Sequence, residues 1–235
     1  MGEKVSQVFV FCLIVGVGLY YTFPYNLSNA DLYATFKSIG VTLALTTGGV
    51  LIGICVGFFL AFLRMLHIKI INFFIDEYID IMRGTPIVIQ LLIFAYVIFA
   101  TLSDNFIAAL VALGLNSSAY IAEIVRSGIQ SIDKGQMDAG RAMGLSYTTT
   151  MKEIIMPQAI KNILPSLANE FIVLFKETSV VGYISVNDIT LQSKTLQAIV
   201  YNPTPMIFAA IIYYALVKIF SWFVKLLEWK LHKND

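Results

Sequence analysis

Residues 135–157 read GQMDAGRAMGLSYTTTMKEIIMP. The segment is charged and rich in small residues, whereas the chain on either side of it is strongly apolar. Charged groups are costly at bilayer depth, so a membrane protein has little reason to gather Asp138, Arg141 and Glu153 in one segment unless that segment lies in water. Its alanine and glycine positions suit the close docking of another protein. We therefore interpret residues 135–157 as a contact surface exposed to water.

Composition assigns the chain to the membrane proteins. Hydrophobic residues make up 58% of it, charged residues make up 13%, and the mean hydropathy is +0.78, which is far more apolar than a soluble domain. The net charge of +1 and the scattered basic residues argue against nucleic acid as a partner. Cys12 and Cys55 both fall inside apolar runs, so the sequence predicts neither a disulfide framework nor a metal site.

Uncharged stretches locate the membrane helices, because one helix needs roughly 20 apolar residues to cross a bilayer. Five stretches contain no Asp, Glu, Lys or Arg: residues 5–30, 39–63, 84–103, 105–122 and 195–217. A sixth stretch, residues 160–186, carries charges, but its apolar residues still follow helical spacing. The sequence therefore predicts an all-α, polytopic bundle of six membrane helices.

Basic residues predict the orientation, because lysine and arginine are enriched in cytoplasmic loops. A cytoplasmic N-terminus places most of them at or inside the cytoplasmic face, and Lys37 and Lys194 outside. Both termini and residues 135–157 are then expected in the cytoplasm. Residues 5–24 could instead be a signal peptide ending near Ala30, which would leave the other five helices and their orientation unchanged.

The spacing within residues 135–157 resembles the cytoplasmic loop signature of ABC importer permeases. In that signature, E-A-A is followed by three residues, a glycine, nine residues and I-x-L-P. The corresponding positions here are Asp138, Ala139, Gly140, Gly144, Ile154, Met156 and Pro157. Three of them depart from the pattern: Asp138 replaces Glu, Gly140 replaces the second Ala, and Met156 replaces Leu. These departures concern the details of the contact and leave the spacing intact.

Three further segments extend the resemblance to permeases for polar amino acids, the histidine, glutamine and arginine uptake group. They are Arg83-Gly84-Thr85-Pro86 followed by Gln90, the run NSSAYIAEIVR at residues 116–126, and KETS at residues 176–179. The sequence Pro157-Gln158-Ala159 also fits. The resemblance covers roughly residues 39–226. It implies a five-helix permease core plus an extra N-terminal transmembrane helix, with residues 1–30 forming that segment and residues 31–235 the permease domain.

The resemblance also implies the partners. The chain contains no G-x-x-x-x-G-K-[ST] phosphate loop, so ATP and Mg²⁺ would be bound by a partner ATPase and not by this chain, which would do no covalent chemistry. Two ATPase subunits would dock on the cytoplasmic loops, at about residues 131–160 here. A second permease subunit, identical or related, would complete the pathway in the bacterial inner membrane. An extracytoplasmic binding protein would deliver the amino acid.

The coupling element implied by the resemblance is a short helix near residues 138–145. We expect Asp138 to lie near its N-terminus, where the helix dipole favours an acid. Small side chains at Ala139, Gly140 and Gly144 would let the backbones of the two proteins approach closely. A second glycine series, Gly48, Gly49, Gly53 and Gly57, repeats at helical spacing and predicts close packing between membrane helices.

Polar residues inside the predicted spans are the candidates for the substrate pathway, since they usually face a cavity or a partner. An amino-acid zwitterion needs partners of both signs, and the later part of span 160–186 offers both together with hydroxyl groups. The pathway candidates are Gln90, Asn116, Asn169, Glu170, Lys176, Glu177, Thr178 and Ser179. For Glu123 and Arg126 we favour a structural ion pair, because they are three residues apart on one helix.

Other functions stay open at this point. The chain could be an ABC permease for a different small solute, or a secondary transporter or channel that uses the intramembrane charges for ion coupling. A structural subunit of a membrane enzyme is a further alternative, for which paired histidine ligands would be expected within spans. The sequence does not distinguish among amino acids, nor a second copy from a paralogue as the permease partner.

Overall fold

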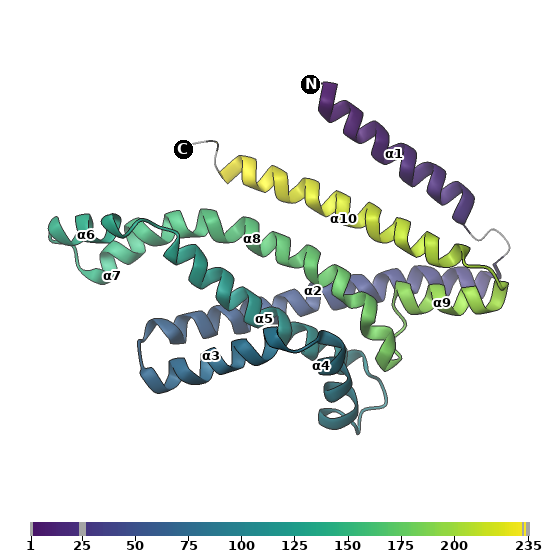
Figure 1. Cartoon of the computed structure of the whole chain (residues 1–235), viewed down its shortest axis with the longest axis horizontal. Coiled ribbons are helices and arrows are strands. Elements are labelled where there is room, and N and C mark those ends of the chain that lie inside the picture. The colour runs from purple at the N-terminus through teal and green to yellow at the C-terminus, as the bar shows by residue number, and fades with distance from the viewer. Residues whose placement is uncertain (1, 24–26, 232, 234–235) are drawn as a thin grey trace.

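A computed structural model describes residues 2–23, 27–231 and 233 as an elongated bundle of helices (Figure 1). The described residues contain no strand, so the all-α prediction is confirmed. The short helices α6 (Lys134–Ala142) and α7 (Tyr147–Thr150) lie at one end of the bundle. The start of α2 (Asn29–Met65) and helix α9 (Ile189–Val200) lie at the opposite end.

The centre of the bundle is the contact between α2 and α5 (Phe106–Gln130). Small residues make it possible: a Cβ added at Gly57 would lie 2.8 Å from the Ser118 carbonyl oxygen, and one at Gly53 would lie 2.9 Å from the Ser117 Oγ. The predicted close packing of this glycine series is confirmed. Helix α2 begins ten residues before the predicted span 39–63. Ser28 caps this helix by accepting a hydrogen bond from the Asp31 amide.

The span predicted at residues 84–103 is wrong in its bounds, because it omits the preceding helix over residues 69–84 and begins at the last residue of that helix. Helix α3 (Lys69–Gly84) ends there, and α4 (Ile87–Ile93), continued by the π-helical turn η1 (Phe94–Ile98), leaves at an angle of 106° to it. The cause is Pro86, because the residue before a proline is driven out of the helical region. Thr85 is accordingly extended, with φ −109° and ψ 140°.

The predicted span 195–217 is also wrong, because it is divided between two helices. Helix α9 ends at Val200, Tyr201 turns the chain with a φ of 51°, and α10 runs over Thr204–Leu231. The predicted span 160–186 comprises most of α8 (Met156–Glu177) and the 3-10 helix η3 (Thr178–Ile184).

Helix α1 (Gly2–Thr22) packs along α10 and is shorter than the predicted span 5–30. Its Phe11 ring lies 4.9 Å from the Trp222 ring in an edge-on arrangement, and a Cβ added at Gly18 would lie 2.6 Å from Ile211. Residues 24–26, within the same predicted span, lie outside the described residues.

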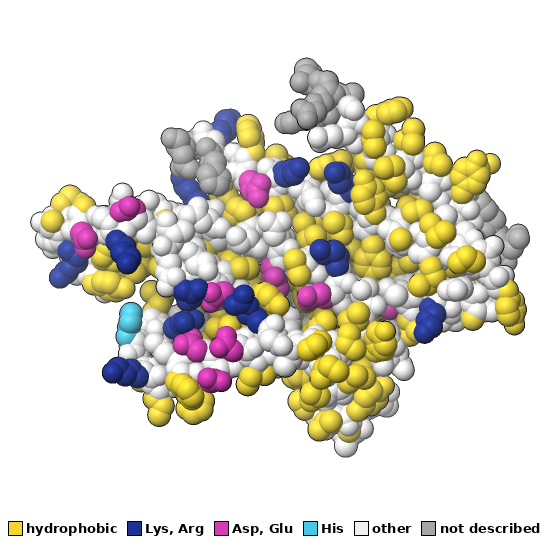
Figure 2. Space-filling view, in the orientation of Figure 1, with side chains coloured by type: hydrophobic (Ala, Val, Ile, Leu, Met, Phe, Trp, Pro, Cys, Tyr) yellow, Lys and Arg dark blue, Asp and Glu magenta, His cyan; other side chains and the backbone are white. Residues whose placement is uncertain are grey.

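Within the described part of the chain, three helices are long and apolar enough to cross a membrane, namely α2, α5 and α10, and the bent pair of α3 with α4 and η1 makes a fourth. The apolar part of α1, Ser6–Thr22, is shorter, and α8 carries several charges. The expected total of six spans, which also requires α1 and α8 to cross the membrane, therefore stays a prediction. Figure 2 shows charged side chains gathered over the half of the molecule that carries α6 and α7, while apolar side chains cover the opposite half.

Candidate functional site

The predicted coupling segment forms a helical hairpin that projects from the end of the bundle (Figure 1). Helix α6 begins at Lys134, four residues before the predicted start, because the Asp133 side chain caps it by accepting a hydrogen bond from the Gly135 amide at 2.6 Å. Asp138 therefore lies in the middle of α6. The predicted dipole role of Asp138 is wrong, and Asp133 takes that position.

Gly144 ends α6 in a left-handed conformation with a φ of +84°. Its amide donates to the Arg141 carbonyl at 3.0 Å, and the Leu145 amide donates to the Gly140 carbonyl at 3.1 Å. This pair of bonds is the Schellman motif, in which glycine is preferred because it has no Cβ to oppose a positive φ. The glycine of the loop signature thus shapes the hairpin, and its expected role in close docking of a partner stays a prediction.

Gly140 faces the interior of the hairpin. It is buried, and a Cβ there would lie 2.5 Å from the Thr150 Cγ2 atom, so the departure from alanine at this position is explained by contact with α7. The outward face of α6 instead consists of Asp138, Ala139, Ala142 and Met143, all exposed. We call these four residues the α6 face.

Two further signature residues lie where the hairpin joins the bundle. Ile154 is half-buried within the π-helical turn η2 (Met151–Ile155), and Pro157 stands in the first turn of α8. The chain therefore passes from α7 through η2 into α8 without a loop.

Gln90 and Asn116 come together at the break between α3 and α4. Pro86 has no N–H to donate to the Met82 carbonyl four residues earlier. Two side-chain amides replace it: Gln90 Nε2 donates to Met82 O at 2.8 Å and Asn116 Nδ2 donates to the same oxygen at 3.0 Å. Asn116 Nδ2 also donates to Gln90 Oε1, and both side chains are buried. In this structure the two candidates stabilise the break.

Glu170 lies inside the bundle against α5. Its side chain is 5% exposed and accepts a hydrogen bond from Ser117 Oγ at 2.9 Å. Ser117 was not predicted as a site residue, although it stands in the same NSSAY run as Asn116. The neighbouring Asn169 is exposed. Adjacent positions on α8 therefore face in different directions.

The remaining candidates lie at the end of α8 and the start of η3. Lys176 and Ser179 line a cavity of about 410 Å³ together with Thr190 of α9 and Tyr213 of α10. Glu177 is half-buried. Thr178 is fully buried, and its hydroxyl donates to the Phe175 carbonyl at 2.7 Å. The structure therefore brings only part of the predicted set together around one cavity.

Sequence reasoning missed Tyr213 and Asp188 beside this cavity. Asp188 is fully buried and caps α9 by accepting hydrogen bonds from the Thr190 and Leu191 amides, while Tyr213 donates to it at 3.3 Å. The N-cap could have been found, since an aspartate directly precedes an apolar helical run. The contact with Tyr213 has no local signal, because the two residues belong to different helices.

The predicted ion pair between Glu123 and Arg126 is confirmed. Arg126 donates to both Glu123 carboxylate oxygens, at 2.8 Å from its Nε, and also to Gln130 Oε1. Arg64 and Asp76 form a second ion pair between α2 and α3, at 2.9 Å. Within the described residues, no three His, Cys, Asp or Glu side chains are grouped so that they could hold a metal ion.

A family model and similar relatives all assign the chain to the same family. Residues 53–233 match the family model described as "Binding-protein-dependent transport system inner membrane component". The chain is 38% identical over 218 residues to the arginine transport system permease protein ArtQ of Bacillus subtilis (strain 168), an alignment that covers 88% of this chain and 100% of ArtQ. It is 36% identical over 198 residues to the putative glutamine transport system permease protein GlnP of Rickettsia typhi (strain ATCC VR-144 / Wilmington), covering 83% of this chain and 91% of GlnP.

Solved structures agree with this family. A chain in the crystal structure of an amino acid ABC transporter with histidines superposes with a TM-score of 0.80 at 40% identity, covering 85% of this chain and 94% of that chain. An inward-facing MetNI methionine ABC transporter shares the fold, with a TM-score of 0.72 at 20% identity, covering 87% of this chain and 99% of that chain. The chain belongs to the family of binding-protein-dependent transport system inner membrane components, the permease subunits of ABC importers.

Proposed function

We propose that this permease subunit carries a polar amino acid across the bacterial inner membrane, driven by ATP that a partner ATPase binds with Mg²⁺ and hydrolyses. The observation that carries the proposal is the α6 face, an exposed helical surface at the end of a hairpin that continues directly into α8. The relatives named for arginine and glutamine, and the neighbour described with histidines, support a polar amino acid as the substrate.

The path from α6 to the pathway candidates supports the coupling role. Helix α8 starts at Met156, next to the hairpin, and carries Glu170 and Lys176 farther along its length. Because α7, η2 and α8 are continuous, a displacement of α6 by the ATPase would be transmitted along α8 to these residues. Two ATPase subunits, a second permease subunit and an extracytoplasmic binding protein complete the proposed complex, with membrane lipid around it.

The orientation we propose places α6 and both termini in the cytoplasm. The half of the molecule that carries α6 and α7 is also the half over which charged side chains gather (Figure 2), and α10 runs toward that end (Figure 1). We also propose that α1 stays part of the mature subunit, since Phe11 and Gly18 pack against Trp222 and Ile211 of α10.

The test adds a charge to the α6 face. Ala139→Glu places a carboxylate on the exposed docking surface, and Ala30→Glu makes the same change at an exposed position in the first turn of α2, at the opposite end of the molecule. We expect Ala139→Glu to abolish co-purification of the ATPase and amino-acid uptake, with membrane insertion unchanged. Ala30→Glu should retain the ATPase. Normal ATPase association in Ala139→Glu would refute the proposed docking surface.

A further inference from the structure

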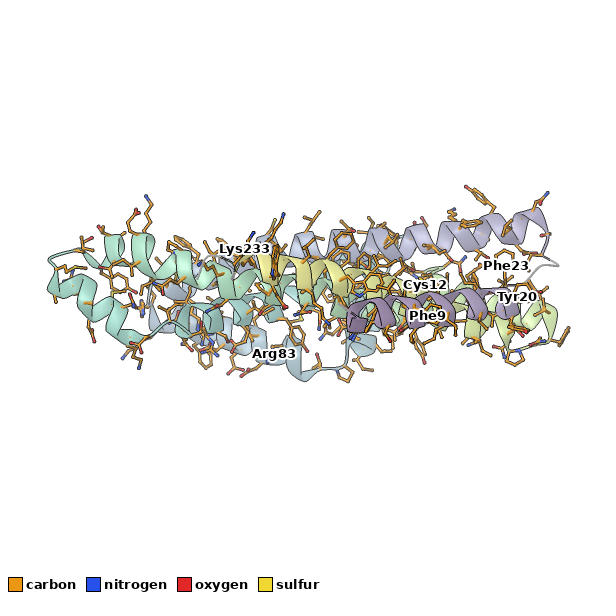
Figure 3. All side chains as sticks on the ribbon, turned by 90° about the horizontal axis from the view of Figure 1, so that it is seen from above. Phe9, Cys12, Tyr20, Phe23, Arg83 and Lys233 are labelled. Carbon is orange, nitrogen blue, oxygen red and sulfur yellow. The ribbon has the colours of Figure 1, made fainter. Side chains whose placement is uncertain are left out.

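A second polar cavity, of about 360 Å³, lies between the end of α3, the second half of α5 and the first half of α8. Its polar lining consists of Arg83, Tyr120, Glu123, Ser127, Ser131, Asn162 and Ser166. These residues are distinct from the pathway candidates. Along α8 the cavity is nearer to the coupling hairpin than Lys176 is, and Arg83 lies in the middle part of the molecule's length (Figure 3).

The break after α3 fixes Arg83 at this cavity. Gln90 and Asn116 hold the Met82 carbonyl, one residue before Arg83, as described above. One turn after Asn116 on α5, the Tyr120 ring lies under the guanidinium group, with 5.4 Å between Arg83 Cζ and the ring centroid. An arginine over an aromatic face is attracted to it and keeps its N–H donors free in the plane of the guanidinium group. The segments RGTP (residues 83–86) and NSSAY (residues 116–120) thus together position the guanidinium group of Arg83.

Arg83 forms no ion pair within the described residues, although the carboxylate of Glu123 in the same cavity attracts its charge. Glu123 also lines the cavity, but both of its carboxylate oxygens accept hydrogen bonds from Arg126. Among the described residues, the ion pairs Arg64–Asp76, Arg126–Glu123 and Lys152–Glu153 do not include Arg83. The Asn162 amide donates to Ser131 Oγ at 2.8 Å and the Ser166 hydroxyl donates to the Asn162 carbonyl at 3.3 Å, while Ser127 adds a further hydroxyl to the lining.

We propose that this cavity is a carboxylate-binding subsite in which Arg83 receives the α-carboxylate of the transported amino acid on the coupling-hairpin side of the pathway. A guanidinium group binds a carboxylate through two parallel hydrogen bonds, and a volume of about 360 Å³ is sufficient for a small polar ligand. The inference rests on the proposed amino-acid transport and adds a binding group that the α8 candidates do not include.

The experiment measures binding of a labelled amino acid to the purified complex of permease and ATPase, without the binding protein. Arginine, glutamine and histidine are tested on the wild type, and the one that binds most tightly is then compared with its carboxamide, which lacks the carboxylate. Arg83→Gln removes the cation, and Arg83→Lys keeps the charge without the planar fork. Lys69→Gln removes an exposed cation from the other end of α3 as the matched control.

We expect Arg83→Gln to weaken binding of the amino acid about tenfold or more, the loss typical of a charged hydrogen bond, and to leave the weak binding of the carboxamide unchanged. Arg83→Lys should be intermediate, and it supplies the test if Arg83→Gln does not assemble. Lys69→Gln should match the wild type. Equal losses for the amino acid and its carboxamide would show a merely structural role and overturn the proposal, as would unchanged amino-acid binding in both Arg83 variants.

An anionic lipid phosphate is the other oxyanion that could occupy the cavity. The comparison is therefore repeated in dodecyl maltoside after lipid removal, where we expect the difference between the wild type and Arg83→Gln to persist. Its disappearance there would assign the cavity to lipid and overturn the proposal. Absence of binding by the wild type to all three amino acids would instead contradict the proposed substrate class, which is a different failure from an Arg83 variant that binds like the wild type.

Discussion

The α2–α5 contact and the α6–α7 hairpin both depend on small residues, but for different physical reasons. At Gly57 of α2, an added Cβ would lie 2.8 Å from both the Ile121 Cγ2 atom and the Ser118 carbonyl oxygen, so the constraint is steric. At Gly144 nothing lies within 4 Å of an added Cβ, and the constraint is the positive φ of +84°. A glycine in the sequence therefore does not reveal which of the two requirements it meets.

The largest effect is expected where the steric constraint includes backbone atoms. Gly57→Val would force α2 and α5 apart, and overpacking of this kind costs about 1–3 kcal/mol or more. We expect most of the complex to be lost, as measured by thermal unfolding in detergent and by the yield of assembled permease. Gly40→Val is the matched control on the same helix, because nothing lies within 4 Å of a Cβ there. Similar yields for the two variants would contradict the steric explanation.

The polar part of the α5 contact gives the second prediction. Glu170→Leu leaves the buried Ser117 hydroxyl without its acceptor, which costs about 1–3 kcal/mol, whereas Glu170→Gln keeps an acceptor oxygen. We therefore expect Leu to reduce the amount of assembled complex and Gln to preserve it. If the carboxylate also serves the pathway, Gln should lower uptake per assembled complex. Normal uptake per complex in Glu170→Gln would restrict Glu170 to the helix contact.

The third prediction is a smaller and local effect in the hairpin. Gly144→Ala places a Cβ at a positive φ, which costs about 1–2 kcal/mol, whereas asparagine tolerates this conformation. We expect Ala to weaken ATPase association and Asn to retain it, while the melting temperature of the permease stays near that of the wild type in both. A large drop in melting temperature for Gly144→Ala would show that the hairpin stabilises the bundle. It would contradict our expectation that Gly57 affects the stability of the bundle and that Gly144 does not.

The last prediction concerns the side of the membrane on which each end of the molecule lies. We expect no change in the stability of the permease. The background is a chain in which Cys12→Ala and Cys55→Ala remove both native cysteines. A single cysteine then replaces either Ser146 in the hairpin or Tyr201 between α9 and α10. Both positions are exposed, and they lie at opposite ends of the molecule. An impermeant thiol reagent should label residue 201 in intact cells and residue 146 only after the membrane is opened. The reverse pattern would invert the proposed orientation.

Much of the fold was predictable because it follows from local patterns. Apolar length located most of the long helices, although it missed α3, and the glycine series at helical spacing indicated the α2 contact. The errors occurred where a local break interrupts an uncharged stretch. Pro86 separates α3 from α4 near the start of residues 84–103, and the turn at Tyr201 divides residues 195–217, although neither break introduces a charge. Both breaks have a sequence signal, namely Pro86 itself and the Asn202-Pro203 pair that directly follows Tyr201.

The candidate site was predictable only in part. The coupling segment was located by spacing, but the outward face of α6 depends on where Asp133 starts the helix and on the contact of Gly140 with Thr150. Gln90 and Asn116 stood out as polar residues within apolar stretches, and their role in the substrate pathway stays a prediction. Their joint contact with the Met82 carbonyl could not be predicted, because that oxygen is left free only by the bend at Pro86.

The sequence by itself determined that this is a helical membrane protein, that it resembles the ABC importer permeases, and which charged segment lies apart from the apolar helices. These properties depend on hydrophobicity and on spacing along one chain. Only the tertiary structure decided that Glu170 meets Ser117, that Tyr213 meets Asp188, and that Arg83 lies over Tyr120. Those contacts join different helices, and helical periodicity specifies the face on which a side chain lies but not the helix that packs against that face.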